Sequence, residues 1–275
     1  MQEQKYILEN VKSFEPKHIF ECGQCFRWDE EPDGSYTGIV KDNVINVKKV
    51  DNTVYFTSLG ADNLKNLVDD YFDLGRDYEK IKETLSEIDE YLENSIRYGN
   101  GIRILNQDLW ETIISFIISA NNNIPRIKGI INRISQKYPT VENLAKATVE
   151  DLRNLGLGFR DVRVYETTHK ILNKEVDLEK LHQEPDTQKV RDTLLTLSGV
   201  GPKVADCILL FSTLKRFDVF PIDVWVRRVM NELYIKNEDE TKVNKREIEK
   251  LAKEKYGDLE GLAQQYLFYW KRDTA

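Results

Sequence analysis

The spacing of apolar residues changes partway along the chain, and this change most limits the fold that it can adopt. Between residues 34 and 58, apolar and polar positions alternate in three runs that begin at Tyr36, Val44 and Val54. Turn-forming Asp, Asn and Gly residues separate the runs. Such alternation predicts an antiparallel meander with one buried face. A further strand is expected within residues 10–28.

From about residue 62 onward, helical spacing takes over. Apolar residues recur every three or four positions over 77–98, and residues 110–120 are strongly apolar, which predicts a helix buried all round. Further helices are expected at 62–71, 143–154, 160–173, 187–197, 203–214, 223–234, 244–254 and 258–271. The sequence therefore predicts an α+β fold, in which an N-terminal lobe with an antiparallel sheet (1–98) packs on a helical body (99–275).

Composition limits the class of protein and its partners. With 40% apolar and 32% charged residues, the 275-residue chain resembles ordinary globular proteins and lacks the roughly 18 apolar residues in a row of a membrane span. The N-terminus lacks the apolar core of a signal peptide, so we expect a cytoplasmic, membrane-free location, on the nucleoid in a prokaryote. The net charge of −7 argues against a nucleic-acid partner. However, Lys and Arg outnumber Asp and Glu over 187–236, and the acidic side chains are concentrated at 69–93 and 237–249.

The cysteines give little support for a metal or redox centre. Cys22 and Cys25 have the spacing of a zinc or redox half-site, but Cys207 is remote and the three histidines are scattered. Because structural zinc needs four ligands, the sequence predicts no metal and no cofactor.

Residues 197–207 form the strongest candidate site, with the sequence Leu-Ser-Gly-Val-Gly-Pro-Lys-Val-Ala-Asp-Cys. Gly199 and Gly201 precede a helical segment, and the N–H groups of such a turn bind anions such as phosphate. Lys203 follows in the first helical turn, and Asp223 lies twenty residues further on. A lysine amine is a nucleophile when its surroundings favour the uncharged form. These residues suggest chemistry on a nucleic-acid sugar; the alternative is a Gly-rich turn with a solvated lysine.

This run, with Pro-Ile-Asp at 221–223, resembles the helix-hairpin-helix–Gly/Pro–Asp signature of DNA base-excision glycosylases, with the hairpin at about 187–214. Four other segments resemble elements of the 8-oxoguanine DNA glycosylases in family order. They are Gly-Gln-Cys-Phe-Arg-Trp at 23–28, Ser-Ala-Asn-Asn-Asn-Ile at 119–124, Gly-Leu-Gly-Phe-Arg at 156–160 and Gly-Leu-Ala-Gln-Gln-Tyr-Leu-Phe at 261–268. The resemblance runs nearly end to end, without the four-cysteine cluster of the superfamily's iron–sulfur branch.

The resemblance implies that a damaged nucleotide is swung out of the duplex, at a cost of a few kcal/mol for unstacking. Phe159 and Arg160 would wedge into the DNA, while Asn121 fills the gap and Arg126 donates to a cytosine partner. Local alternatives remain, because residues 121–123 also suit a helix cap and Phe159 also suits packing on the core.

The flipped base would enter a pocket of four residues. Phe268 would stack on it, and Gln264, four residues earlier on the same helix face, would bind its Watson–Crick edge. The carbonyl of Gly23 would accept the N7 hydrogen that guanine lacks. Cys207, four residues after Lys203, would line the pocket. Core packing is the alternative for Phe268.

The mechanism implied is covalent. Lys203 would attack the sugar C1′, displace the base and form a Schiff base, after which β-elimination nicks the strand. Asp223 would stabilise the cationic sugar; its alternative is a helix N-cap. Two residues depart from the eukaryotic members: Trp225 replaces a histidine, and Phe159 replaces a tyrosine.

The sequence thus predicts a monomeric, bifunctional 8-oxoguanine DNA glycosylase and lyase that acts on double-stranded DNA containing 8-oxoguanine. Two alternatives remain. The first is a sister glycosylase for other damaged bases, against which Gly23, Gln264 and Phe268 argue. The second is a noncatalytic helix-hairpin-helix DNA-binding module, against which Lys203 and Asp223 argue.

Overall fold

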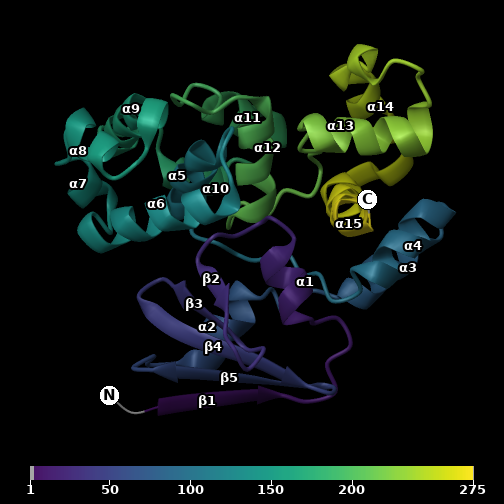
Figure 1. Cartoon of the computed structure of the whole chain (residues 1–275), viewed down its shortest axis with the longest axis horizontal. Coiled ribbons are helices and arrows are strands. Elements are labelled where there is room, and N and C mark those ends of the chain that lie inside the picture. Colours follow the sequence, from purple (N-terminus) through teal and green to yellow (C-terminus); the bar gives the residue numbers. More distant parts are fainter. Residues whose placement is uncertain (1–2, 275) are drawn as a thin grey trace. The chain divides into compact units, whose positions relative to one another are not determined.

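The computed structural model of the protein describes residues 3–274 and divides into two compact units (Figure 1). Residues up to 106, together with those from 216 onward, form the sheet unit. Residues 107–215 form the hairpin unit. One antiparallel sheet and a large helical part confirm the α+β class. The domains expected at 1–98 and 99–275 stay a prediction, since contacts define a compact unit and independent folding defines a domain.

The sheet has five strands in the order β1-β5-β4-β3-β2, and every neighbouring pair is antiparallel. The strands are β1 (Glu3–Leu8), β2 (Trp28–Glu30), β3 (Tyr36–Val40), β4 (Asn43–Val50) and β5 (Thr53–Leu59). The predicted meander is confirmed as β3, β4 and β5. Its turns carry Lys41 and Asp51 at positive φ, as tight turns require. The strand β1 lies outside the range expected from the sequence, because its apolar side chains are few.

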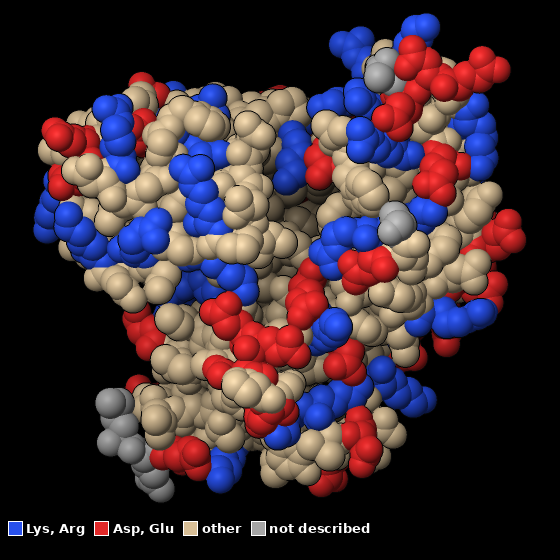
Figure 2. Space-filling view, in the orientation of Figure 1, with Lys and Arg blue, Asp and Glu red and all other residues tan. Residues whose placement is uncertain are grey.

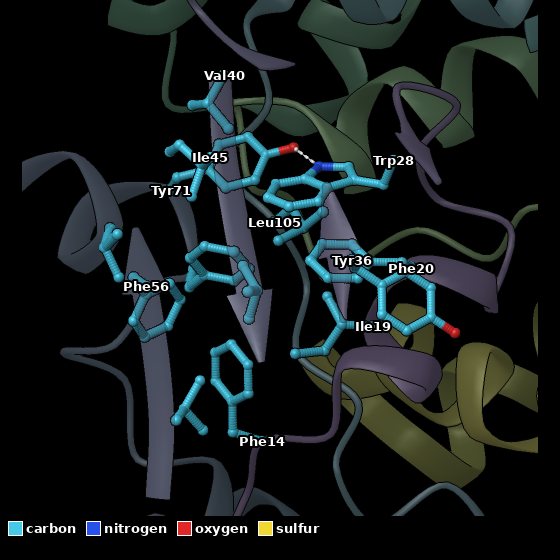
Figure 3. Close-up of a cluster of buried hydrophobic side chains, with 14 of the residues drawn as sticks. Phe14, Ile19, Phe20, Trp28, Tyr36, Val40, Ile45, Phe56, Tyr71 and Leu105 are labelled. Atoms are coloured by element: carbon cyan, nitrogen blue, oxygen red, sulfur yellow. Dashed lines mark hydrogen bonds between the residues drawn. The ribbon is translucent and has the colours of Figure 1, made fainter. Parts of the chain in front are cut away.

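An aromatic core fills the inner face of the sheet (Figure 3). The rings of Phe20 and Trp28 stack with centroids 4.0 Å apart, and Trp28 Nε1 donates to the hydroxyl of Tyr71 at 3.0 Å. Gly38 faces Trp28 across the β2–β3 pair, and a Cβ there would lie 2.2 Å from the indole. Only glycine therefore fits at Gly38, and the end of the segment 23–28 is anchored in this core.

Within the residues described, the sheet unit also contains seven α-helices and one π-helical turn. They are α1 (Pro16–Glu21), α2 (Leu64–Tyr71), α3 (Tyr78–Ser86), α4 (Glu90–Tyr98), α13 (Val224–Met230) with the π-helical turn Asn231–Ile235, α14 (Lys245–Tyr256) and α15 (Glu260–Thr274). The single helix expected at 77–98 is wrong: it breaks before α4, where Asp89 adopts an extended conformation and accepts from Leu92 N. Helix α15 is buried over most of its surface and contacts α4, α13 and α14 (Figure 1).

The hairpin unit is helical throughout. Its helices are α5 (Leu109–Ser119), α6 (Ile124–Lys137), α7 (Val141–Leu144), α8 (Val149–Asn154), α9 (Asp161–Leu172), α10 (Leu178–Gln183), α11 (Thr187–Leu194) and α12 (Pro202–Phe211). Helix α5 is buried on nearly all sides, as expected. The helix expected at 143–154 splits into α7 and α8, because Thr148 and Asp151 form a capping box that starts a new helix. Helix α10 was not anticipated.

Candidate active site

Gly23 and Phe268 lie against each other in the sheet unit. A Cβ placed on Gly23 would lie 3.7 Å from Phe268 Cε1, and Gly23 has a φ of +89°, which disfavours other residues. The loop is fixed from both sides: Gln265 Nε2 donates to Cys22 O, and the buried Gln24 Nε2 donates to the Arg103 carbonyl at 2.8 Å. The glycine backbone is therefore held rigidly beside the ring of Phe268.

Gln264 lies on the same helix as Phe268 and lines a crevice that is too narrow to admit a water molecule. The crevice is lined by Gln264 and by the apolar side chains of Phe220, Val226, Val229, Met230, Leu267 and Phe268. Gln264 is 5% exposed, and within residues 3–274 its Oε1 has no hydrogen-bond partner. A buried acceptor without a donor costs about 1–3 kcal/mol. A ligand with an N–H group would remove that cost.

Asp223 caps helix α13. Its side chain accepts a hydrogen bond of 2.8 Å from Val226 N, and its backbone is extended. The capping role that the sequence suggested as an alternative is therefore confirmed, and it leaves the second carboxylate oxygen available for other contacts. The neighbouring Trp225 has a buried Nε1 that lacks a hydrogen-bond partner in the described part of the chain.

Lys203 and Cys207 lie one turn apart on α12. Lys203 is half-buried, and its Nζ lies 5.5 Å from the centroid of the Phe116 ring, which itself stacks on Phe211. Cys207 is 3% exposed. The side chain of Lys203 thus packs beside two stacked aromatic rings. This packing limits the directions in which its amine can point.

The turn before α12 places its two glycines in different environments. Gly199 has a φ of +83°, and a Cβ there would lie 2.9 Å from Arg163 Cδ and 3.1 Å from Ile117 Cγ2. Gly201 caps α12 with an ordinary φ of −94°, and a Cβ there would meet nothing within 4 Å. The protein itself therefore requires glycine at Gly199, whereas the open space above Gly201 suits a partner that approaches the backbone closely.

Helices α9 and α11 hold this turn in place. From α9, Thr167 Oγ1 donates to Ser198 O at 2.9 Å and Lys170 Nζ donates to Thr196 O at 2.8 Å. Arg191 of α11 forms an ion pair with the buried Asp206 of α12, with Nε and Oδ1 2.6 Å apart. These contacts tie the hairpin turn to α9 and its two helices to each other.

The three successive asparagines have different contacts. Asn123 caps α6 by accepting from Arg126 N, and Asn122 Nδ2 donates to Ile118 O at 3.1 Å. Asn121 is exposed and adopts a left-handed conformation with a φ of +51°. The helix cap suggested for residues 121–123 is therefore confirmed for Asn123, and Asn121 is the one of the three that faces solvent with a strained backbone.

Phe159 and Arg160 point in different directions. Phe159 is 55% exposed, whereas Arg160 is 2% exposed and donates to the carbonyls of Ala120 and Asn121. The structure thus places Arg160 inside the protein, where it joins two loops. The DNA contact expected for Arg160 from the sequence stays a prediction. The Arg160 Cζ also lies 4.2 Å from the centroid of the Phe159 ring, which is a cation–π distance.

Two arginines of α6 brace the loop that precedes Phe159. The exposed Arg126 donates from Nη2 to Gly156 O at 3.1 Å, and Arg133 donates from Nε to Leu155 O at 2.9 Å. Arg133 was not anticipated, because a lone arginine on an amphipathic helix has no distinctive sequence signal. Arg126 is therefore placed beside the same loop as Phe159.

The structure brings these residues together only within each unit. Gly23, Gln264 and Phe268 gather in the sheet unit, while Lys203, Cys207 and the hairpin gather in the hairpin unit. Pairs that join the two units, such as Lys203 with Asp223, stay predictions.

The cysteines are buried free thiols. Burial raises the pKa of Cys22 to about 11, so its thiolate is scarce at neutral pH. Within residues 3–274, no group of three or more His, Cys, Asp or Glu side chains is placed to hold a metal ion. In the same part of the chain, no helix has the length and apolar character needed to cross a bilayer.

Charge is divided unevenly between the units. The hairpin unit has 15 Lys and Arg against 14 Asp and Glu, out of 40 and 47 in the chain, so the sheet unit carries the remaining 25 and 33. Figure 2 shows Lys and Arg side chains on the face of the hairpin unit that is turned to the viewer. The acidic total therefore comes from the sheet unit, and the hairpin unit is free of the strong negative charge that would repel DNA.

Comparisons with known families cover most of the chain. Residues 6–113 match the model of the N-terminal domain of 8-oxoguanine DNA glycosylase, and residues 114–256 match the HhH-GPD superfamily of base excision DNA repair proteins. The boundary between these matches falls inside α5.

Individual relatives agree with the family models. An N-glycosylase/DNA lyase of Saccharomyces cerevisiae is 36% identical over 159 residues, which span 49% of this chain and only 42% of the yeast protein. A probable N-glycosylase/DNA lyase of Methanothermobacter thermautotrophicus is 32% identical over 74% of each chain. A crystal structure of Clostridium acetobutylicum 8-oxoguanine glycosylase/lyase, bound to double-stranded DNA with cytosine opposite 8-oxoG, is 40% identical with a TM-score of 0.91. It covers 100% of this chain and 98% of the clostridial one.

Proposed function

This chain belongs to the 8-oxoguanine DNA glycosylase family, within the HhH-GPD superfamily of base excision repair proteins, and we propose that Lys203 is its nucleophile. The enzyme removes 8-oxoguanine from duplex DNA and has an associated lyase activity that cleaves the strand. We place it in the cytoplasm, on the nucleoid if the organism is a prokaryote, where its DNA substrate lies.

The observation that carries the base assignment is the unpaired amide oxygen of Gln264, buried beside Phe268 and next to the loop of Gly23. A purine with N1–H and N2–H groups supplies the donors that Gln264 Oε1 lacks. In this proposal Phe268 stacks on the base, and Cys207 contacts the base when DNA is bound. The Gly23 carbonyl accepts the N7–H of 8-oxoguanine, where guanine would present a lone pair and repel it.

The reaction begins at Lys203. The Nζ lone pair forms a bond to C1′ while the C1′–N9 bond breaks, and the departing base takes up a proton. Nζ then loses a proton, and the C1′–O4′ bond breaks as the Nζ lone pair forms a double bond to C1′ and O4′ takes up a proton. The resulting Schiff base allows loss of a C2′ proton and cleavage of the C3′–O bond, which nicks the strand. Asp223 stabilises the positive charge on the sugar in the transition state.

The remaining residues hold the DNA. The turn with Gly199 and Gly201 binds a backbone phosphate through its N–H groups and the start of α12. Asn121 fills the space of the flipped nucleotide, and Phe159 wedges beside it. Arg126 gives up its hydrogen bond to the Gly156 carbonyl and donates instead to a cytosine opposite the lesion. These roles are supported by the exposure of Asn121, of Phe159 and of Arg126 in the first turn of α6, which donates to the loop that precedes Phe159.

Chromatographic detection of free base tests this function. The protein is incubated with three duplexes. Two of them carry 8-oxoguanine or guanine opposite cytosine, and the third carries 3-methyladenine opposite thymine. We expect release of 8-oxoguanine and no release of guanine. Release of 3-methyladenine alone would favour a sister glycosylase, and binding without release of any base would favour a noncatalytic module.

Removing the wedge should slow base release. We expect Phe159→Ala to reduce single-turnover release of 8-oxoguanine by roughly 10- to 100-fold, which corresponds to about 1.4–2.7 kcal/mol in the barrier. Val162→Ala is the matched control, because Val162 is 42% exposed and only three residues away. An unchanged rate in Phe159→Ala would remove Phe159 from the mechanism.

A further inference from the structure

One side chain, Arg163, contacts both the hairpin and the wedge. Its Cδ and Cβ lie 2.9 and 3.0 Å from the position that a Cβ on Gly199 would occupy. Its Cζ lies 5.1 Å from the centroid of the Phe159 ring. The stem of Arg163 therefore covers the hairpin glycine, while its guanidinium reaches the exposed aromatic ring.

The guanidinium of Arg163 differs from the other guanidinium groups of the hairpin unit. Each of the others donates to a backbone carbonyl or a carboxylate, as seen for Arg126, Arg133, Arg153, Arg160 and Arg191. Within residues 3–274, Arg163 has no hydrogen bond or ion pair. Glu166, one turn away, accepts instead from Ser198 Oγ at 2.6 Å. Arg163 thus has five donors available for an external acceptor.

Positive charge accumulates around this side chain. Burial lowers the pKa of Arg160, and the charges of Arg126 and Arg163 lower it further, so the three guanidinium groups act on one another. Such a cluster is unfavourable without an anion and favourable with one. A phosphate satisfies it best, because its oxygens match the fork of a guanidinium.

We propose that Arg163 binds a backbone phosphate of the DNA between the hairpin and the wedge. It is a DNA-binding and positioning residue: the phosphate fixes the guanidinium, which in turn fixes Phe159 relative to Gly199. This inference rests on the proposed function, since it takes the hairpin and Phe159 as DNA-contacting elements.

The salt dependence of binding tests this proposal. Dissociation constants are measured for a duplex with a tetrahydrofuran abasic-site analogue opposite cytosine, over a series of KCl concentrations. Loss of one phosphate contact should reduce the slope of log K against log[salt] by about 0.9. We expect this reduction in Arg163→Met, which keeps the stem that packs on Gly199, and in Arg163→Gln as a second charge-removing variant.

Two further variants make the result specific. Arg163→Lys keeps the charge and should keep the wild-type slope. Lys174→Met removes an exposed charge just beyond the other end of α9 and should also leave the slope unchanged. Weaker binding by Arg163→Met at an unchanged slope would indicate a purely structural role and overturn the proposal, as would unchanged binding.

Base release by the wild type is measured in parallel. If the wild type releases 8-oxoguanine but Arg163→Met has the wild-type slope of log K against log[salt], only the inference about Arg163 fails. If the wild type releases no 8-oxoguanine, the proposed function fails, whatever the slope.

Discussion

The variant Lys203→Gln is expected to lose strand cleavage and to release 8-oxoguanine at least roughly 10³-fold more slowly than the wild type, as enzymes that lose their nucleophile do. Cleavage by β-elimination passes through an imine, and an amide nitrogen cannot form one because its lone pair is delocalised into the carbonyl. Single-turnover base release and gel analysis of nicking measure the two activities separately.

The control for this variant is Lys189→Gln, on the other helix of the hairpin. Lys189 is exposed and contacts Glu184 only at 4.0 Å, so its loss should change the rate by less than about twofold. Thermal unfolding of both variants verifies that the fold is kept. Nicking by Lys203→Gln at a rate near that of the wild type would assign the nucleophile elsewhere.

The hairpin glycines should respond to the same substitution in opposite ways. Gly199→Ala is expected to lower the free energy of unfolding by about 2 kcal/mol or more, because the new Cβ meets Arg163 and Ile117 at a positive φ. Gly201→Ala should lower it by less than about 1 kcal/mol, because alanine is a poorer N-cap than glycine but meets no clash at this ordinary φ. Chemical denaturation measures both values.

Measurements of DNA binding then distinguish a glycine that the fold requires, Gly199, from one that the bound phosphate requires, Gly201. We expect Gly201→Ala to bind the abasic-analogue duplex at least roughly 10-fold more weakly, about 1.4 kcal/mol, because its methyl group occupies the space of the approaching phosphate. Wild-type affinity in Gly201→Ala would contradict phosphate binding at the hairpin. A Gly199→Ala protein as stable as the wild type would contradict the steric argument.

Sequence patterns predicted the parts of the fold that local chemistry determines. Strands β3 to β5 follow from alternation and turn residues, and helix α5 follows from an unbroken apolar run. The helix-capping alternatives for residues 121–123 and for Asp223 follow from the position of Asn and Asp before a helix. Each of these features depends on neighbours within a few residues.

Features that depend on distant contacts were not predictable in the same way. Residues 77–98 keep helical spacing across the break at Asp89. The carboxylate of Asp89 also contacts Tyr234 and Lys255, which lie far away in the chain. The sequence likewise pairs Phe159 with Arg160, but the carbonyls that accept from Arg160 come from residues 120 and 121. An arginine reaches inward or outward according to acceptors that lie far away in the chain.

The most direct test of the central claim is borohydride trapping on a duplex with 8-oxoguanine opposite cytosine, followed by peptide mapping of the adduct by mass spectrometry. The account predicts one covalent protein–DNA adduct, attached at Lys203, and none with the guanine duplex. An adduct at another lysine, or no adduct during active release of 8-oxoguanine, would contradict a mechanism in which Lys203 attacks the sugar.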